Sequence, residues 1–244
     1  DIHCTEELNL CDDVWTSDLT LYANWVNEDD GVPYTYVTLS DGTIEIRSYT
    51  GKRRYITIPE KIDGKIVSSI GDFAFDGQSR LRQVNLPDGL TNIGRFAFRQ
   101  CNNLLEMQLP DGVKTIGEYA FAYNIRLHSI GMNENIALEN IGDFAFAGSG
   151  LTRFNVMENV KSLNGSAFYG ATSLKNFTVS QENENFTAPS GVLFNKTKSK
   201  IVAFPAGVSA SYALPESVTE IGDYAFGYAG FKSIDLNNVQ SIGS

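Results

Sequence analysis

The sequence is short of the residues on which most enzymes and metalloproteins depend. Its 244 residues include 2 histidines and 3 cysteines, and no Cys-x-x-Cys pair or Cys/His cluster has the spacing of a zinc site. Neither histidine accompanies a serine or cysteine nucleophile signature, and no glycine-rich phosphate loop is present. We therefore expect no metal, no cofactor and no catalytic activity.

Basic residues and long apolar runs are also scarce. The chain has 19 lysines and arginines against 29 aspartates and glutamates, which gives a net charge of −10 and a pI near 4.7. Nucleic acids and anionic membrane surfaces attract clustered basic residues, so we expect neither as a partner. No apolar run approaches the ~18 residues of a membrane-spanning helix. The chain begins at Asp1 without a recognisable signal peptide, which indicates an excised segment whose targeting signals lie elsewhere.

What the sequence does contain is a repeated motif, Ile-Gly-x-Phe/Tyr-Ala-Phe, called here the hexad. Full copies start at Ile70, Ile93, Ile116, Ile141 and Ile221. A degraded copy spans residues 163–168, and a last copy starts at residue 242. Successive starting positions differ by 23, 23, 25, 22, 58 and 21 residues. Self-similarity at this period predicts a leucine-rich solenoid, whose units stack because a single unit buries too little apolar surface to fold alone.

A second motif, Leu-x-x-Val-x-Leu-Pro, precedes the hexads. It occupies residues 81–87, 104–110, 127–132, 151–156, 174–179 and 231–236 with some variation. Its alternation predicts a short strand with the Val84 and Leu86 positions inward and the Gln83 and Asn85 positions outward. We expect the Phe-Ala-Phe of the hexad to form one helical turn on the opposite side, with both aromatic rings inward. The glycine of the hexad is expected to let the backbone bend sharply.

The regions outside the regular repeats also carry patterns. Residues 1–30 end in an alternating stretch and an acidic linker. Residues 31–58 contain two alternating runs around Asp41-Gly42, the strongest short hairpin signal, and we expect this hairpin to cap the repeats of residues 59–244. In the 58-residue gap, residues 191–196 and 200–205 predict an extra hairpin.

Several single residues have simple interpretations. Cys101 occupies a small or polar filler position three residues after the hexad, so packing is a better explanation for it than chemistry. Cys4 and Cys11 are close enough in sequence to pair with each other. The third hexad position holds acids in most copies, which we interpret as surface residues rather than a catalytic pair. The chain stops at Ser244 inside a repeat, which predicts an open strand edge prone to edge-to-edge self-association.

The two motifs together resemble the BspA-like (Treponema-type) leucine-rich repeat over roughly residues 34–244. The resemblance implies an α/β, right-handed solenoid with short strands on the concave side, short helical turns opposite and an N-terminal β-hairpin cap. It also implies an extracellular, secreted or surface-attached bacterial protein without shared catalytic residues, often engaged in adhesion to host or microbial partners. Residues 21–25, Leu-Tyr-Ala-Asn-Trp, are similar to the last strand of the Listeria–Bacteroides repeat. The copy at residues 163–168 departs from the pattern, because it lacks the Ile-Gly pair and the first aromatic.

The candidate binding residues are the outward strand positions. They are Tyr55, Gln83, Asn85, Glu106, Gln108, Arg153, Asn155, Asn176 and Asp235. Concave sheets of this kind often bind proteins. Of these residues, only Tyr55 and Arg153 are of the types that dominate binding energy at interfaces, and a solvated face without a partner is an equally good explanation. Two functions therefore stay open, a surface module that binds a host or microbial protein, and a structural spacer that displays other domains.

Overall fold

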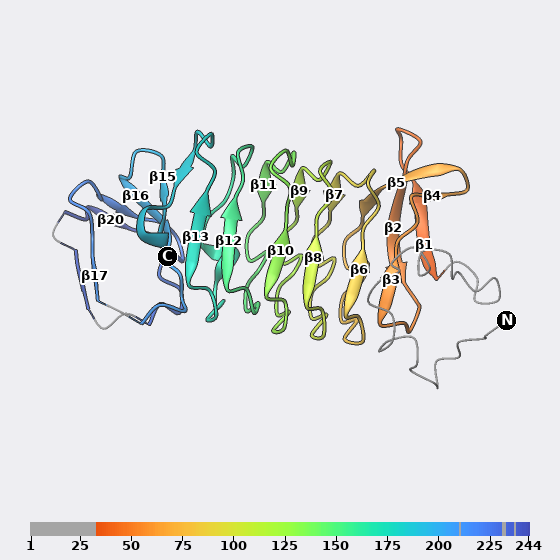
Figure 1. Cartoon of the computed structure of the whole chain (residues 1–244), viewed down its shortest axis with the longest axis horizontal. Coiled ribbons are helices and arrows are strands. Elements are labelled where there is room, and N and C mark those ends of the chain that lie inside the picture. The colour runs from red at the N-terminus through yellow and green to blue at the C-terminus, as the bar shows by residue number, and fades with distance from the viewer. Residues whose placement is uncertain (1–32, 210, 231–232, 237) are drawn as a thin grey trace. The chain divides into compact units, whose positions relative to one another are not determined.

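The computed structural model describes residues 33–209, 211–230, 233–236 and 238–244. The chain divides into two units after Pro33, and the second unit is Tyr34–Ser244. The predicted Listeria–Bacteroides strand, the acidic linker and the Cys4–Cys11 pairing fall outside the described residues. Within the second unit the chain forms a β-solenoid of about eight turns, in which short strands of successive coils lie side by side from β1 to β20 (Figure 1).

The first ladder of strands confirms the Leu-x-x-Val-x-Leu predictions. It consists of β3 (Tyr55–Thr57), β6 (Gln83–Asn85), β8 (Glu106–Gln108), β10 (Ser129–Gly131), β12 (Arg153–Val156) and β13 (Asn176–Val179). β3 pairs with β6, β8 with β10 and β12 with β13, each in parallel. Val84, Met107 and Phe154 are buried, as the alternation predicted. The motif continues in β17 (Tyr212–Ala213) and β19 (Ile234–Asp235), which pair with each other.

A second ladder, which the sequence did not reveal, runs through the first residue of each hexad. Its regular members are β7 (Asn92–Ile93), β9 (Thr115–Ile116), β11 (Asn140–Ile141), β18 (Glu220–Ile221) and β20 (Ser241–Ile242). Each pairs in parallel with the equivalent strand of an adjacent coil. The hexad isoleucines Ile93 and Ile116 are fully buried. The first residue of the hexad therefore lies in a short strand that pairs with the equivalent strands of the adjacent coils.

The predicted N-terminal hairpin is present. β1 (Tyr34–Thr38) pairs antiparallel with β2 (Ile44–Tyr49), and β2 then pairs in parallel with β5 (Lys65–Ile70). The short β4 (Lys61–Ile62) folds back on β5. The sheet runs in the order β1-β2-β5-β7-β9-β11, so the hairpin lies at its end. Its capping role stays a prediction, as do the right-handed winding and the concave position of the strands.

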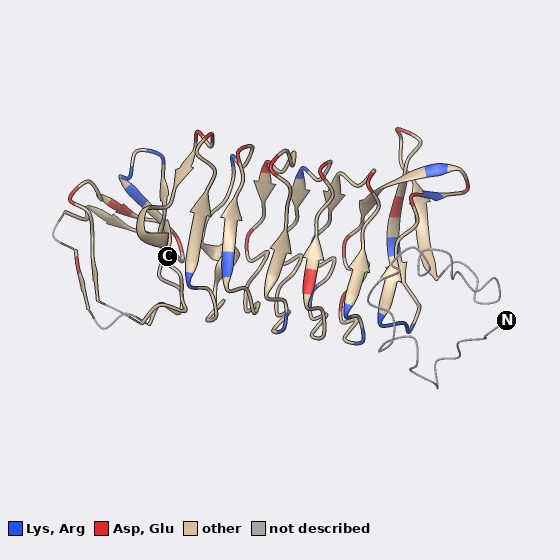
Figure 2. Ribbon diagram, viewed as in Figure 1, with Lys and Arg blue, Asp and Glu red and all other residues tan. Residues whose placement is uncertain are grey.

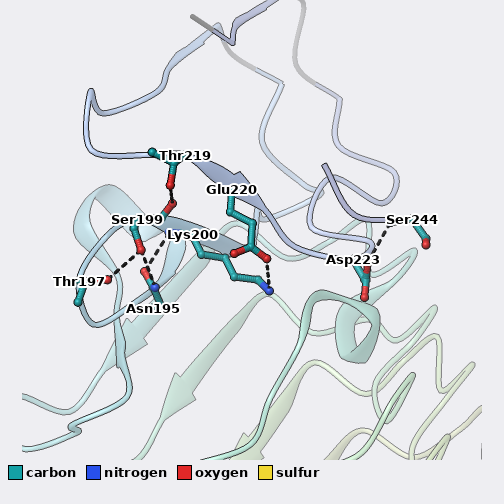
Figure 3. Close-up of polar contacts among 8 residues, drawn as sticks. All are labelled: Asn195, Thr197, Ser199, Lys200, Thr219, Glu220, Asp223 and Ser244. Carbon is teal, nitrogen blue, oxygen red and sulfur yellow. Dashed lines mark hydrogen bonds and ion pairs between the residues drawn. The ribbon is translucent and has the colours of Figure 1, made fainter. Parts of the chain in front are cut away.

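The extra hairpin in the 58-residue gap is also confirmed. β15 (Leu193–Asn195) pairs antiparallel with β14 (Phe186–Thr187) and with β16 (Lys200–Ala203), and β16 pairs in parallel with β18. Figure 3 shows polar contacts within this hairpin and between it and the next coil. The Lys200 ammonium lies 2.6 Å from the Glu220 carboxylate, and the Asn195 side chain accepts from the Lys200 amide at 3.0 Å.

The predicted helical turn of the hexad is wrong. The first aromatic has a positive φ, 61° at Phe73, 57° at Phe96 and 55° at Tyr119. Amides of the turn donate to the next coil instead of closing a helix: Phe96 N donates to Glu118 O at 2.9 Å, and Phe98 N donates to Ala120 O at 2.8 Å. The same pattern recurs from coil to coil, so this side forms a third hydrogen-bonded ladder.

Helix is accordingly almost absent from the described residues, and the α/β class was wrong. The helical elements in the described ranges are two short 3-10 turns, η2 (Gly165–Phe168) and η3 (Pro189–Gly191). η2 forms in the degraded hexad copy. There the Asn164 side chain accepts from the Ser166 amide at 3.0 Å, which is the hydrogen bond of a helix N-cap. The copy that departs most from the motif is therefore the one that adopts the turn predicted for all of them.

The two aromatics of each hexad form two separate rows. The second rings make the inner row, Phe75, Phe98, Phe121 and Phe146, which is fully buried, with adjacent centroids 4.8, 5.4 and 5.6 Å apart. The first rings make the outer row, which points the other way: the side chain of Phe73 is 51% exposed. The prediction that both rings point inward is thus correct for the second ring and wrong for the first. The inner rings form a line rather than one globular centre.

The hexad glycine is required by close approach, not by a sharp bend. None of the described hexad glycines has a positive φ. A Cβ on Gly117 would lie 2.6 Å from the Gly94 carbonyl carbon and 2.7 Å from the Arg95 amide nitrogen. Both atoms belong to the backbone of the neighbouring coil. The side chain is therefore absent because successive coils touch through their main chains at this position.

The filler position after the hexad is a hydrogen-bonding position. The side chains of Gln78, Cys101 and Asn124 each donate to a main-chain carbonyl of the preceding coil, at 3.2, 3.1 and 2.9 Å. The acceptors for the last two are the carbonyls of Phe75 and Phe98. Burial raises the pKa of the Cys101 thiol to about 12. Cys101 is thus a buried, protonated donor, in agreement with the packing role expected from sequence.

Phe121→Ala removes a ring from the middle of the inner row and leaves a cavity between Phe98 and Phe146. We expect the free energy of unfolding to fall by about 3–5 kcal/mol, measured by chemical or thermal denaturation. A loss below ~1 kcal/mol, the range of ordinary surface substitutions, would contradict the burial of this ring.

Gly117→Ala places a methyl group against main-chain atoms that cannot move aside. We expect a loss of about 1–3 kcal/mol in the free energy of unfolding. Gly131→Ala is the matched control, because its methyl group would meet only the tip of the Gln108 side chain, which can rotate away. Equal losses in the two variants would argue against main-chain contact as the reason for the hexad glycine.

The Cys101 thiol should resist alkylation until the protein unfolds. Because its pKa is raised from 9 to about 12 by burial, little thiolate forms between pH 7 and 9, and thiolate is the reactive species. The measurement is the rate of labelling by a thiol reagent in a Cys4→Ser/Cys11→Ser background, with and without denaturant. Native labelling as fast as denatured labelling would refute the assignment.

Candidate functional site

The candidate site lies on the outward side of the first ladder, called here the strand face. It is formed by the outward side chains of β3, β6, β8, β10, β12 and β13. The predicted residues on these strands, Tyr55, Gln83, Asn85, Glu106, Gln108, Arg153, Asn155 and Asn176, are exposed or half-buried as expected. Charge varies along the face, because β8 carries an acidic segment and β12 a basic one (Figure 2).

Strand register brings some of these residues together and separates others. Tyr55 lies opposite Gln83 on the neighbouring strand, and Arg153 lies opposite Asn176. The pairs β3-β6, β8-β10 and β12-β13 follow one another, because β6 contacts β8 and β10 contacts β12. Asp235 is different, because it lies on β19, whose partner is β17. The predicted set therefore consists of one extended group on β3 to β13 and one residue apart from it.

A hollow of about 610 Å³ opens on the strand face over β6, β8 and β10. Four predicted residues line it: Gln83, Asn85, Glu106 and Gln108. Its rim also includes Asp88, Asp111 and Asn133, which sequence reasoning did not select. Asp88 and Asp111 belong to the Asp-Gly turns that follow successive strands, so their repetition was the signal that could have identified them.

The hollow exists partly because β10 ends in a glycine. A Cβ on Gly131 would collide with the Gln108 side-chain oxygen, so the missing side chain leaves room for that amide. The Gln108 amide nitrogen donates to the Leu109 carbonyl at 3.3 Å. On the rim, the Asn133 amide donates to the Asp111 carboxylate at 2.8 Å. The Asn133 and Asp111 side chains at the rim are thus bound to each other before any ligand arrives.

The lining of the hollow is polar and acidic. The carboxylates of Asp88, Glu106 and Asp111 surround it, and its described lining contains neither lysine nor arginine. Amide groups of Gln83, Asn85 and other lining residues supply both donors and acceptors. Such a lining suits a partner that presents amide or cationic groups. The described residues contain no group of three His, Cys, Asp or Glu side chains placed to hold a metal ion.

A second hollow of about 530 Å³ lies farther along the chain, over β13 and β14. It includes the predicted Asn176 together with Thr178, Gln181 and Lys196. The Lys196 ammonium contacts the Asn183 carbonyl. The Asn183 side chain is fully buried and donates to three main-chain carbonyls of the preceding coil. The two hollows differ in charge, and Arg153 and Asn155 lie on a strand between them.

The remaining sequence candidates have structural roles. Asp72 accepts from the Arg95 amide of the next coil at 2.7 Å, and Asp223 accepts from the Ser244 amide at 2.9 Å. These acids join coils, which agrees with the surface role expected for them. His128 is exposed and its ring contacts the Leu105 carbonyl. Within the described ranges, no helix is long and apolar enough to cross a membrane.

Comparison with protein families identifies the repeat. The model of a BspA type leucine rich repeat region (6 copies) matches residues 43–175, 103–213 and 209–244. These ranges together span most of the chain and include every hexad. No curated protein matches the chain.

Several solved structures share the fold. A leucine rich cell surface protein from Faecalibacterium prausnitzii is 23% identical, with a TM-score of 0.60, over 88% of this chain and 72% of that protein. The pneumococcal vaccine antigen PcpA is 22% identical, with a TM-score of 0.68, over 86% of this chain and 68% of its own. A leucine rich repeat protein from T. pallidum is 24% identical, with a TM-score of 0.58, over 86% of this chain and 83% of that protein. At these identities the likeness concerns the fold.

Proposed function

Because this chain belongs to the BspA type leucine-rich repeat family, we propose that it is a non-catalytic, extracellular bacterial module that binds another protein through the strand face. The observation that carries the proposal is the hollow over β6, β8 and β10. It coincides with Gln83, Asn85, Glu106 and Gln108, residues selected from the outward strand positions alone. A host or microbial surface protein is the expected partner.

The face suits a protein more than a small molecule. Its two hollows are shallow and polar, and they lie along one continuous row of strands. Small-molecule sites are instead concave and mostly apolar. A protein loop could place its own amide and cationic groups against the Asp88, Glu106 and Asp111 carboxylates. Arg153, exposed on β12, would supply a contact of the opposite charge.

A structural spacer is the alternative, and one observation favours it. On β6 the outward side chains bind each other: Gln83 donates to Asn85 at 3.0 Å, and Asn85 donates to Thr57 at 3.1 Å. Side chains satisfied in this way gain less from a partner. A solenoid stiffened by such contacts would hold other domains of a longer surface protein at a distance.

The double variant Arg153→Glu/Asn155→Arg and the single variant Gly131→Leu separate the two functions. The first rearranges charge on β12, and the second fills the hollow beside Gln108. Under the binding proposal each should weaken partner binding by at least about tenfold, roughly the loss of one or two interface contacts. Lys114→Glu, an exposed charge reversal outside the strand face, is the matched control and should bind normally.

The measurement is binding to a panel of host and microbial surface proteins and glycans, with variant folding checked by thermal denaturation. A partner whose affinity falls in both strand-face variants but not in the control supports the proposal. Absence of binding across the panel at micromolar concentration, or a partner indifferent to both variants, would favour the spacer.

A further inference from the structure

The outer row of aromatic rings is regular over its first four members and then changes. Phe73, Phe96, Tyr119 and Phe144 are stacked nearly parallel, with adjacent centroids 4.7, 4.9 and 4.8 Å apart. The degraded copy has Ser166 where the next ring belongs. The row is interrupted there, at the coil that forms η2.

Tyrosines from two coils converge on this interruption. The ring of Phe144 meets Tyr169 and Tyr224 edge-on, at centroid distances of 6.0 and 5.4 Å. Tyr169 meets Tyr224 at 5.5 Å and Tyr228 at 5.0 Å, again nearly perpendicular. Tyr224 and Tyr228 are 39% and 62% exposed. After Phe144 the parallel stacking of the row thus gives way to perpendicular packing. The resulting cluster leaves parts of Tyr224 and Tyr228 exposed to solvent.

Tyr123 extends the cluster on the neighbouring coil. It is 46% exposed and lies over Gly148, where an added Cβ would be 2.8 Å from its ring. Tyr169 lies over Gly227 in the same way, because a Cβ added to Gly227 would lie 2.7 Å from the Tyr169 ring. Gly148 and Gly227, which lack a side chain, therefore leave the space that the Tyr123 and Tyr169 rings occupy. Rings held in place in this way can bind with little loss of conformational freedom.

Folding does not require tyrosine at two of these positions. Tyr123 and Tyr228 share the second left-handed position of the turn, with φ of 60° and 61°. Other copies hold Gly77, Gly148, Gly170 or Gln100 at this position. A left-handed conformation suits glycine better than an aromatic residue. The tyrosines at this position add exposed aromatic surface that the turn itself does not need.

Acidic residues are sequence neighbours of several of these rings. Glu118, Asp143 and Asp223 each precede a ring of the outer row or of the cluster. Burial, and then the neighbouring Tyr123 and Glu118, raise the pKa of the Tyr119 phenol. For Tyr169 the phenol of Tyr228 is the main cause of its raised pKa, followed by burial. The phenols therefore stay neutral, and Glu118 is paired with Arg95 at 3.3 Å. The negative groups beside the cluster are the exposed carboxylates of Asp143 and Asp223, each of which also accepts a hydrogen bond from a neighbouring coil.

The other end of the outer row shows how a cation fits such a surface. The Arg99 guanidinium carbon lies 4.8 Å from the centroid of the Phe96 ring, and its nitrogens bind the Asp76 carboxylate at 2.9 and 2.8 Å. Among the described residues, both cation–π contacts are made with Phe96. In the copies around the cluster, the position of Arg99 is occupied by Ala122, Ala147, Tyr169 and Gly227. Rings and carboxylates are thus present there without the arginine.

We propose that the cluster of Tyr123, Tyr169, Tyr224 and Tyr228 is a second interaction surface, separate from the strand face, which binds an arginine-bearing loop of a partner protein. The guanidinium group would lie over an exposed ring, as Arg99 lies over Phe96, and would pair with the Asp143 or Asp223 carboxylate. Arginine fits this role better than lysine, because its planar group stacks on aromatic faces and pairs with carboxylates at the same time.

The double variant Tyr123→Gln/Tyr228→Gln tests the proposal in the full chain. Glutamine already occupies this position as Gln100, so the variant should fold. The probe is a fluorescent peptide of alternating glycine and arginine, titrated at about 150 mM salt to screen long-range attraction. Loss of two exposed cation–π contacts should weaken binding about tenfold. Ile66→Gln, which removes an exposed apolar side chain on β5 outside both surfaces, should leave peptide binding unchanged.

Three further measurements can overturn the proposal. A lysine peptide of the same length that binds as tightly as the arginine peptide would show attraction to net charge alone. Glycan binding that disappears in the double variant would show that the cluster takes carbohydrate instead. Self-association of the chain that disappears in the double variant would make a second copy the occupant. Unchanged peptide affinity in the double variant would also refute the site.

Discussion

The structure depends on direct contact between successive coils. Three hydrogen-bonded ladders join them, one through the strand face, one through the hexad isoleucines and one through the aromatic turn. The inner row of phenylalanines fills the space that these ladders enclose. At the hexad glycine the main chains touch, with 2.6 Å between the Gly94 carbonyl carbon and a Cβ built on Gly117. The distance between successive coils is therefore limited by main-chain contact, and the side chains pack within that distance.

The sequence predicted the strands and the repeat, because both follow from alternation and period. It failed at the aromatic turn for a physical reason. The Phe96 and Phe98 amides of this turn donate to carbonyls of the next coil, and no local sequence pattern records such a contact. The glycine was recognised, but its role depends on a neighbour 23 residues away. The same limit applied to the site: outward residues on single strands were predictable, whereas the hollow arises from Gly131 beside Gln108.

One scaffold thus presents two kinds of surface. The strand face is polar and mixed in charge, and some of its side chains bind one another. The surface of the outer row is aromatic, and the first ring of each regular hexad has a left-handed backbone conformation there. The degraded copy at η2 stays compatible with stacking, and it also breaks the outer row where Tyr169 and Tyr224 meet. A departure from the repeat can therefore preserve the fold and still change the surface.

Native-state hydrogen exchange at the amides of Phe98 and Phe121 tests the central claim most directly. These amides lie in segments without regular secondary structure, and they donate to Ala120 and Ala145 of the next coil at 2.8 and 2.7 Å. If stacking holds the solenoid together, both amides should exchange only through opening of the stacked coils, with protection close to that of the Ile93 and Ile116 strands. Exchange of Phe98 and Phe121 at the rate of an exposed turn would contradict the account.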